Sequence, residues 1–427
     1  MPGFPEAPRP GTDQYRGSAG MQGILTNMSL EFPLPQGRAA GREPLRIAVL
    51  SHLHHPISSP FQGGLEMHTS LMVEEFASRG HDVTLFAKEG STSTARVTTV
   101  LDSAFEFRRG LSPRRMQAQQ QVLDEALGRA VQAVSSGGYD VVVNNSLSLL
   151  PYVALADMPM LTILHTPPLP WIVDAVADGR APLSPLHRFV SVSARNATGW
   201  SPHLPDLQVI HNGIRLADWP AGTEARGGVA VWAGRVTPEK GLHIAIDAAR
   251  LAGMELHFAG PISDARYFER TVSPHLGRGV EHVGHLDHRA LASFLGSGEV
   301  FIASPVWSEP FGLTALEAMA CGTPVAALPL GAMPEIINAD AGSLADGLGA
   351  DALAEAVSNA RTLSRGAVRA SAARFSAAAM VDAYERELGV LLSPDGLRTA
   401  PKAAPGAAAE ALRRPAAGRA GSSALVP

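Results

Sequence analysis

Short apolar runs rich in β-branched residues alternate along most of the chain with amphipathic stretches of helical period. This alternation predicts strands joined by helices in a parallel sheet. The first unit has a strand at 45–50, a loop ending in Gly63-Gly64, a helix with Gly80 suited to its C-terminal cap, and a returning strand at 81–86. Further strands of this half are expected at 141–143, 161–164, 190–192 and 209–210.

The same pattern starts again after a Gly-rich segment near residues 220–227. A strand at 229–233 is followed by a turn and a helix, for which Thr237 suits the N-cap and Pro238 the first helical position. Later strands are expected at 256–258, 280–283 and 300–302. Two doubly wound α/β domains are the most economical arrangement of these elements.

The two ends of the chain lack this pattern. Residues 1–44 are dense in Pro, Gly and polar residues, and residues 393–427 are rich in Ala, Pro and Gly. We expect a disordered leader and a disordered tail, because neither segment can bury enough apolar surface to offset the entropy of ordering. The tail carries several cations, and a contact with anionic lipid is the alternative to a solvated terminus.

The composition excludes several classes of protein. The formal net charge is -5, from 35 Lys+Arg and 40 Asp+Glu, so there is no general electrostatic attraction for nucleic acid. A single cysteine, Cys321, excludes an internal disulfide framework and is typical of a reducing compartment. No stretch of about 20 residues is continuously apolar. We therefore expect a cytoplasmic protein whose contact with a membrane is at most peripheral.

The densest set of motifs lies at 304–325, where a strand runs into a loop and then a short helix. Helix N-termini in doubly wound folds lie at the carboxyl edge of the sheet, so the amides of Gly312 and Leu313 could meet a phosphate. A carboxylate beside such a site suits the hydroxyls of a ribose or a hexose, and both Glu309 and Glu317 qualify. The alternative is that Glu309 is solvated and Glu317 satisfies nearby backbone.

A second constellation is the strand-to-helix turn at 234–241, which carries Arg235 and Lys240. A guanidinium fork and an ammonium that converge on a helix N-terminus make a sound clamp for a diphosphate. Taken alone, this turn would be read as two surface cations. It occurs together with the motifs at 304–325, which favours the clamp.

Two further patterns match known sites weakly. His52, His54 and His55 cluster in the first loop, but without a nearby cysteine or a two-histidine helical spacing they are expected to face a cleft rather than to bind zinc. The segment 347–352 matches a dinucleotide-binding pattern. A dinucleotide-binding loop follows a strand, and 338–342 does not read as one. We therefore interpret the segment 347–352 as an ordinary loop before a helix.

These motifs together resemble glycosyltransferase family 4, a large family of retaining enzymes. The resemblance covers roughly residues 45 to 392. It is carried by the turn at 234–241, by Glu309 and Glu317 separated by seven residues, and by three landmarks in the right order, which are Gly63-Gly64, His165-Thr166-Pro167 and Asn212-Gly213.

The resemblance implies a GT-B fold, in which two Rossmann-like domains face each other across the active-site cleft. The N-terminal domain at 45–222 would bind the acceptor. The domain at 226–376 would bind the nucleotide sugar. A last helix at 377–392 would cross back to the first domain.

The resemblance also implies a role for each matched residue. Arg235 and Lys240 would bind the diphosphate, and Glu317 the ribose hydroxyls. Glu309 would contact the transferred sugar, with His165 at the same sugar from across the cleft. Backbone amides near Phe311, Gly312 and Leu313 would complete the site. Independently of the family, the Gly63-Gly64 loop allows the backbone to approach the phosphates or the acceptor.

The expected function is transfer of a hexose from a nucleoside diphosphate sugar to an acceptor hydroxyl with retention, without a metal or other cofactor. Front-face attack assisted by the leaving phosphate is expected, and a covalent double displacement on Glu309 is the second mechanism. An epimerase or hydrolase of sugar nucleotides on the same scaffold and a non-catalytic sugar-nucleotide binder are the alternatives. The sequence names neither the sugar, the base, the acceptor nor the oligomeric state.

The sequence departs from the family pattern at two places. The segment 331–335 reads Gly-Ala-Met-Pro-Glu where a double glycine is usual before the glutamate. Asn144-Asn145 stands where relatives often carry a histidine. Both departures bear on the identity of the sugar and the acceptor more than on the class of reaction.

Overall fold

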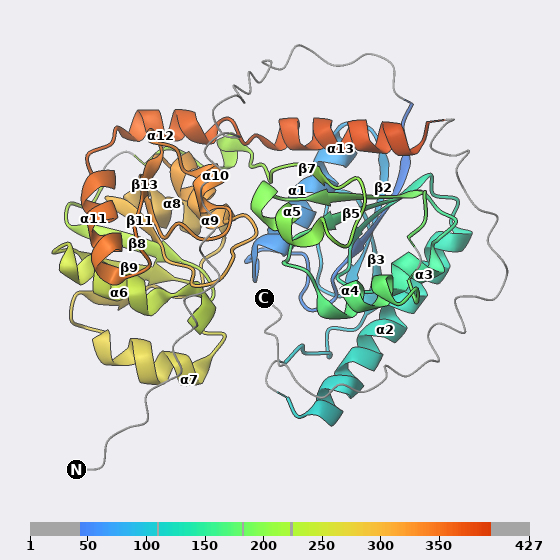
Figure 1. Ribbon diagram of the computed structural model, residues 1–427, viewed down its shortest axis with the longest axis horizontal. Helices are drawn as coiled ribbons and strands as arrows, with labels where there is room; N and C mark the ends of the chain where they lie inside the picture. The colour runs from blue at the N-terminus through green and yellow to red at the C-terminus, as the bar shows by residue number, and fades with distance from the viewer. Residues whose placement is uncertain (1–42, 109–110, 182, 223–224, 394–427) are drawn as a thin grey trace. The chain divides into compact units, whose positions relative to one another are not determined.

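The computed structural model describes residues 43–108, 111–181, 183–222 and 225–393 (Figure 1). All but the innermost residues of the expected leader and tail lie outside these ranges, so the expectation of disorder concerns residues that the structure does not describe. The described chain forms two parallel sheets, each with helices on both faces. The prediction of two doubly wound α/β domains is confirmed.

The first sheet has the order β3-β2-β1-β4-β5-β6-β7, and all its neighbours are parallel. The strand order reverses direction between β1 and β4, the position at which doubly wound folds bind ligands. The strands are β1 (Arg46–Ser51), β2 (Asp82–Lys88), β3 (Arg96–Leu101), β4 (Val141–Asn145), β5 (Met160–Leu164), β6 (His187–Ser191) and β7 (Gln208–Val209).

The second sheet has the order β10-β9-β8-β11-β12-β13 and is also fully parallel. Its direction reverses between β8 and β11. The strands are β8 (Val229–Ala233), β9 (Glu255–Ala259), β10 (Val280–His282), β11 (Val300–Ala303), β12 (Val325–Ala327) and β13 (Gly342–Leu344).

Helices connect these strands and cover the sheets. None of the helices in the described ranges is both long and apolar enough to cross a membrane. The α-helices are α1 (Gly64–Ser78), α2 (Pro113–Ser136), α3 (Leu150–Ala154), α4 (Pro170–Ala177), α5 (Ala194–Trp200), α6 (Leu242–Leu251), α7 (Ala265–Tyr267), α8 (His288–Ser297), α9 (Leu313–Ala320), α10 (Met333–Ile336), α11 (Ala350–Ala360), α12 (Arg365–Ala372) and α13 (Ala377–Leu391). Short 3-10 or π turns are η1 (Leu216–Asp218), η2 (Pro238–Lys240), η3 (Phe268–Val272) and η4 (Ser273–His275).

The side chains of β1 show how the sheets bury both faces. Ile47 and Val49 belong to the core that α1 and α13 cover, whereas Ala48 and Leu50 belong to the core on the α2 side. Successive side chains of a strand point to opposite faces, so a strand covered on both sides is apolar throughout. The short, continuously apolar runs in the sequence have this cause.

Helix α13 follows the second domain but packs on the first, alongside α1 (Figure 1). Ion pairs hold it there, with Arg79 Nη1 2.6 Å from Asp382 Oδ1 and Arg188 Nη2 2.7 Å from Glu387 Oε2. Its N-terminus lies against the backbone at Gly213, where a Cβ would come within 2.4 Å of the Ser376 carbonyl oxygen. The last helix therefore follows the second domain in sequence and packs on the first.

Two expectations need correction. Residues 347–349 are a loop that leads into α11, as interpreted, and 338–341 form no strand, but a strand, β13, begins at Gly342. A Cβ at Gly342 would lie 2.0 Å from the Val325 carbonyl oxygen, so the strand depends on a glycine that the sequence pattern reads as a break. The helix expected from Pro238 is also divided. Residues 238–240 form the turn η2, and α6 starts only after Gly241, whose φ of 67° interrupts the helix.

Candidate functional site

A pocket lies between the carboxyl ends of the two sheets. The loops after β1 and β5 and the start of α1 line it on one side, and the loops after β8 and β11 and the start of α9 line it on the other. Parallel strands bring their carboxyl ends to one edge, which explains why residues so distant in sequence meet here. The sequence-predicted residues that line this pocket are His165, Arg235, Lys240, Glu309, Phe311, Gly312, Leu313, Gly63 and Gly64.

Glu317 is the one predicted site residue outside this lining. It lies in the second turn of α9 with only 4% of its surface exposed. Burial raises the pKa of its carboxyl to about 8, so the group is mostly protonated at neutral pH. In this structure Glu317 lies inside the helix that borders the pocket and does not face the cavity.

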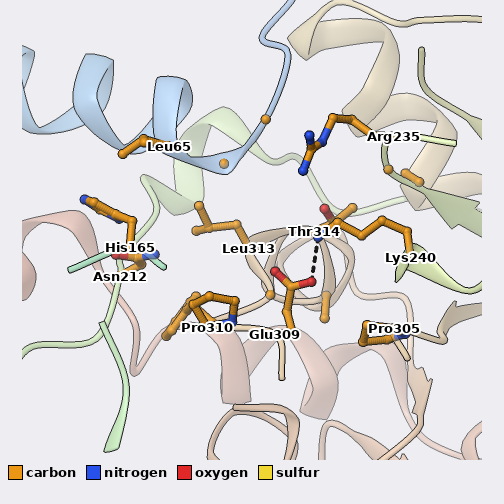
Figure 2. Close-up of a pocket in the computed structure, with 18 of the residues that line it drawn as sticks. Leu65, His165, Asn212, Arg235, Lys240, Pro305, Glu309, Pro310, Leu313 and Thr314 are labelled. Carbon is orange, nitrogen blue, oxygen red and sulfur yellow. Dashed lines mark hydrogen bonds and ion pairs between the residues drawn. The ribbon is translucent and has the colours of Figure 1, made fainter. Parts of the chain in front are cut away.

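The two cations differ in their surroundings. Nζ of Lys240 forms an ion pair with Glu309, at 2.6 Å from Oε2, and the indole N–H of Trp307 donates to the same oxygen at 3.0 Å. The ammonium also lies 5.1 Å from the centre of the Trp307 ring. Arg235 has no carboxylate partner anywhere in the described ranges, and Figure 2 shows its guanidinium on the same side of the pocket as Lys240.

The N-terminus of α9 opens into the pocket beside these cations. Its N-cap is Gly312 at φ 95°, and no side chain caps this end of the helix. The first backbone N–H groups of a helix have no acceptor within it, so they are available to an anion. The φ of 95° favours glycine here, and a Cβ at this position would also displace the Met333 methyl group, 2.0 Å away.

The Gly63-Gly64 loop brings the N-termini of α1 and α9 close together. A Cβ at Gly64 would lie 3.0 Å from Cδ1 of Leu313 on the opposite side of the pocket. The φ of Gly63 is -172°, an extended value that any residue adopts. The glycine at 64 is therefore explained by the close approach of Leu313.

His165 lies on the opposite side of the pocket from the cations, next to Asn212 (Figure 2). Burial, together with the neighbouring His68 and His52, lowers the pKa of its imidazole well below the usual value, so the ring is neutral at physiological pH. Within the described part of the chain, neither its Nε2 nor Oδ1 of Asn212 has a hydrogen-bond partner. Both atoms are buried and both residues line the pocket, so the fold leaves two unsatisfied polar groups beside the cavity.

The histidines of the first loop face the pocket, as expected. His52, His54 and His55 all line it, and no three His, Cys, Asp or Glu residues of the described ranges are grouped closely enough to hold a metal ion. Burial lowers the pKa of His55 to about 4. The His55 imidazole is therefore a neutral hydrogen-bonding group in the first-domain wall.

Sequence reasoning did not single out Glu66, which is buried in the same wall. Its Oε1 lies 3.4 Å from Nε2 of His52. Burial acts to raise the pKa of its carboxyl, but His52 and the backbone N–H at the start of α1 bring it down to about 2. The signal that could have revealed it is a glutamate in the first helical turn after the Gly63-Gly64 loop. Trp307, within 304–325, and Asn212, within Asn212-Gly213, were not assigned roles of their own from the sequence.

The unusual segment 331–335 joins the two domains as well as bordering the pocket. Met333 lines the cavity, whereas the Glu335 carboxylate accepts hydrogen bonds from the backbone N–H groups of Ala194 and Arg195 at 2.8 and 2.7 Å. Nε2 of His211 lies 3.0 Å from the same carboxylate. Glu335 therefore links the second domain to the start of α5 in the first.

Two family models match the chain. Residues 62–218 match Glycosyltransferase Family 4, and residues 227–362 match Glycosyl transferases group 1. A glycogen synthase of Mycobacterium tuberculosis is 29% identical over 344 residues, which cover 70% of this chain and 81% of that protein. A D-inositol 3-phosphate glycosyltransferase of Mycolicibacterium vanbaalenii is 28% identical over 405 residues, which cover 80% and 89%.

Solved structures are similar over nearly their whole length. A sucrose-phosphate synthase of Thermosynechococcus elongatus matches with a TM-score of 0.66 and 20% identity, over 81% of this chain and 99% of that one. The HepE protein of Anabaena, solved in complex with UDP-glucose, matches with a TM-score of 0.62 and 17% identity, over 81% and 100%. At this identity the likeness shows the fold.

Proposed function

We propose that this chain, which belongs to the family 4-like glycosyltransferases of GT-B fold, transfers a hexose from a nucleoside diphosphate sugar to an acceptor hydroxyl with retention of configuration. The chain is an enzyme of the glycosyltransferase class. The donor and the stereochemistry are our proposal. The observation that carries it is the meeting of Arg235, Lys240 and the uncapped N-terminus of α9 in one pocket, opposite His165.

The donor diphosphate is assigned to this positive region. An anion there would meet the guanidinium fork of Arg235, the ammonium of Lys240 and the first amides of α9, near Phe311, Gly312 and Leu313. Charge develops on the diphosphate as its bond to the sugar breaks. Fixed positive groups aimed at that charge lower the barrier without reorganising, so the proposed reaction needs no divalent ion and no further cofactor.

The transferred sugar is assigned to the space between Glu309 and His165. The Glu309 carboxylate, held by Lys240 and Trp307, has its other oxygen available to a sugar hydroxyl. The neutral His165 can exchange a hydrogen bond with the sugar through Nε2. HepE, a structural relative, was solved with UDP-glucose, which supports a sugar nucleotide as the donor class.

We propose front-face transfer as the mechanism. The bond from the anomeric carbon to the diphosphate oxygen breaks, the acceptor oxygen bonds to the same face of that carbon, and the acceptor proton passes to the departing phosphate. Double displacement would instead need Glu309 as the nucleophile. Oε2 of Glu309 already accepts hydrogen bonds from an ammonium and an indole, which reduces its nucleophilicity and favours the front-face path.

Glu317 stays our proposal for the ribose hydroxyls. Its position in α9, close behind the pocket wall, supports this role, although the carboxyl does not line the cavity in the present structure. Contact with a ribose would therefore need a shift of this side chain or of the α9 N-terminus when the donor binds.

The acceptor is proposed as a glycan, a lipid-linked sugar or a small hydroxyl compound, bound against the first-domain wall. The names of two relatives, a glycogen synthase and a D-inositol 3-phosphate glycosyltransferase, show how widely acceptors differ among similar proteins. A cytoplasmic location with at most peripheral membrane contact is part of the same proposal and rests on the composition.

The experiment combines a donor screen with product analysis. UDP-, GDP- and ADP-hexoses are tested by thermal shift, because a donor that binds the native state raises the melting temperature. The donor that binds is then incubated with acceptors in EDTA, and NMR reports the anomeric configuration of the product. Transfer in EDTA with retention supports the proposal. An inverted product, full dependence on added metal, or epimerisation of the donor without an acceptor would contradict it.

A further inference from the structure

Three buried side chains from three separate elements lead from the last helix to the pocket. The Tyr384 hydroxyl of α13 lies 3.0 Å from Nε2 of His68 on α1. The His68 ring meets the ring of His165, which follows β5, edge to face at 4.4 Å between centroids. His165 lines the pocket, so Tyr384 of α13 is linked to the pocket through a single residue, His68.

The hydrogen-bond inventory assigns the proton on His68. Tyr384 is fully buried and His68 is 1% exposed, and Nδ1 of His68 has no partner within the described ranges. If the hydroxyl donates to Nε2, only the Nδ1–H is left unpaired. If Nε2–H donates instead, both the hydroxyl proton and the Nδ1 lone pair are left unpaired. The first arrangement leaves fewer buried groups unsatisfied, so Tyr384 fixes the tautomer of His68.

Burial also keeps all three groups neutral. It lowers the pKa of His68 to about 3 and raises the pKa of the Tyr384 hydroxyl above its usual range. The pKa of His165 is lowered as well. An uncharged imidazole with a defined orientation is the form that can exchange a hydrogen bond with a neutral sugar.

We propose that Tyr384 is a positioning residue for the transfer reaction, which acts through His68 to hold the His165 ring in the orientation that contacts the donor sugar. This inference rests on the proposed function. Helix α13 also lies behind Asn212, the other pocket residue with an unpartnered buried oxygen among the described residues. Sδ of Met380 accepts a hydrogen bond from the backbone N–H of Gly213, the residue next to Asn212. The last helix thus supports both groups from behind.

A purely structural role for the Tyr384 hydroxyl is the competing explanation. Helix α13 has other anchors on the first domain, including the ion pairs of Asp382 with Arg79 and of Glu387 with Arg188. The Tyr384 ring itself packs in the core. Tyr384→Phe keeps that ring and those ion pairs, so it removes the hydrogen bond to His68 while the helix stays docked.

The kinetic test compares Tyr384→Phe with Glu387→Gln, which removes an anchor of α13 that does not reach the pocket. Tyr384→Phe should lower kcat about tenfold and leave the donor KM within about twofold. Glu387→Gln should leave both unchanged. In a His165→Ala background, Tyr384→Phe should have no further effect, because the pair acts as one unit.

A spectroscopic test does not depend on activity. Long-range proton–nitrogen NMR of histidine-labelled protein reports the tautomer of each ring, with His68 and His165 assigned from variants. The wild type should show Nε2 of His68 as the acceptor nitrogen, and Tyr384→Phe should shift the signals of both histidines. If no donor is turned over, the proposed function fails while this measurement still decides the positioning role. Two results would overturn the positioning role. One is unchanged His165 signals in Tyr384→Phe, and the other is that Tyr384→Phe lowers kcat as much in the His165→Ala background as in the wild type.

Discussion

Nζ of Lys240 lies 2.6 Å from Oε2 of Glu309, so one cation of the proposed diphosphate clamp is engaged by a carboxylate before any donor binds. The other cation, Arg235, has no such partner in the described part of the chain. In the proposed clamp, an incoming diphosphate would meet Arg235 directly and would compete with Glu309 for Lys240. Replacing Glu309 should therefore change the contribution of Lys240 to diphosphate binding but not that of Arg235.

Replacing either cation should weaken the donor. We expect Arg235→Ala and Lys240→Ala each to cost about 1.5 to 3 kcal/mol of donor binding, the usual contribution of a charged hydrogen bond. Titration calorimetry with the donor found in the screen measures this loss. Arg250→Ala is the matched control, because that arginine is exposed on α6 and its ion pair is with the neighbouring Asp247. Wild-type affinity in both variants would refute the assignment of the diphosphate site.

Glu309→Gln should separate binding of the nucleotide from binding of the sugar. The neutral amide releases Lys240, so the nucleoside diphosphate alone should bind about two- to fivefold more tightly. Transfer should fall by about a hundredfold or more, because the proposed contact with the sugar is weakened. Calorimetry measures the affinity for the nucleoside diphosphate, and a single-turnover assay measures the rate of transfer. Weaker diphosphate binding together with full transfer would contradict both roles of Glu309.

Glu317→Gln should change how stability depends on pH. Burial raises the folded-state pKa of Glu317 to about 8, so the native state holds a proton that the unfolded state releases near pH 4.5. The stability that this group contributes is complete at low pH and is lost as pH rises toward 8. The variant lacks this loss and should gain stability relative to the wild type between pH 5.5 and 8, by on the order of a few kcal/mol.

Urea unfolding of both proteins at the two pH values measures this difference. Glu281→Gln serves as the control, since that carboxylate is largely exposed. A difference in stability that does not change with pH would show that Glu317 is ionised in the native state.

Glu335→Gln should loosen the link between the domains. Burial acts to raise the pKa of this carboxyl, but His211 and two backbone N–H groups lower it overall. A depressed folded-state pKa adds stability above the unfolded pKa, and that stability is lost as pH falls through the folded value. At pH 7 we expect a loss of about 1 kcal/mol, since the group is partly exposed. The Ala194 and Arg195 amides should exchange hydrogen faster, whereas unchanged protection would show that the contact is incidental.

Removing residues 1–42 and 394–427 should leave an active core. The prediction follows from composition, because these segments have too little apolar surface to offset the entropy of ordering. The measurement is the transfer rate of a chain that spans residues 43–393. Loss of transfer with an intact fold would assign a function to one of the ends.

Much of the architecture was accessible from sequence because buried parallel strands carry their own signal. The strands β1, β8 and β11 coincide closely with continuous apolar runs. Strand β13 was missed because its first residue, Gly342, is required by close packing and not by strand propensity. The start of α6 was missed because Pro238 satisfies local capping rules for a turn that does not continue.

The site was predictable where residues act locally and was not where partners come from distant segments. Arg235, Lys240 and Glu309 belong to motifs whose residue types match a phosphate and a sugar. The pairing of Lys240 with Glu309, across 69 residues, depends on how β8 and β11 are placed in the sheet. The link from His68 to Tyr384 spans 316 residues and depends on where α13 docks. Spacing along the chain contains no such information.

The position of α13 has a consequence for synthesis of the protein. The ribosome releases the strands of the first sheet long before it releases residues 377–391, yet Tyr384 and Leu388 complete the core that Ile47 and Val49 begin. Until α13 arrives, apolar surface beside α1 is open to water and to other nascent chains. We therefore expect the N-terminal half to leave the ribosome as an unfinished domain, whose core closes only when the last helix has been made.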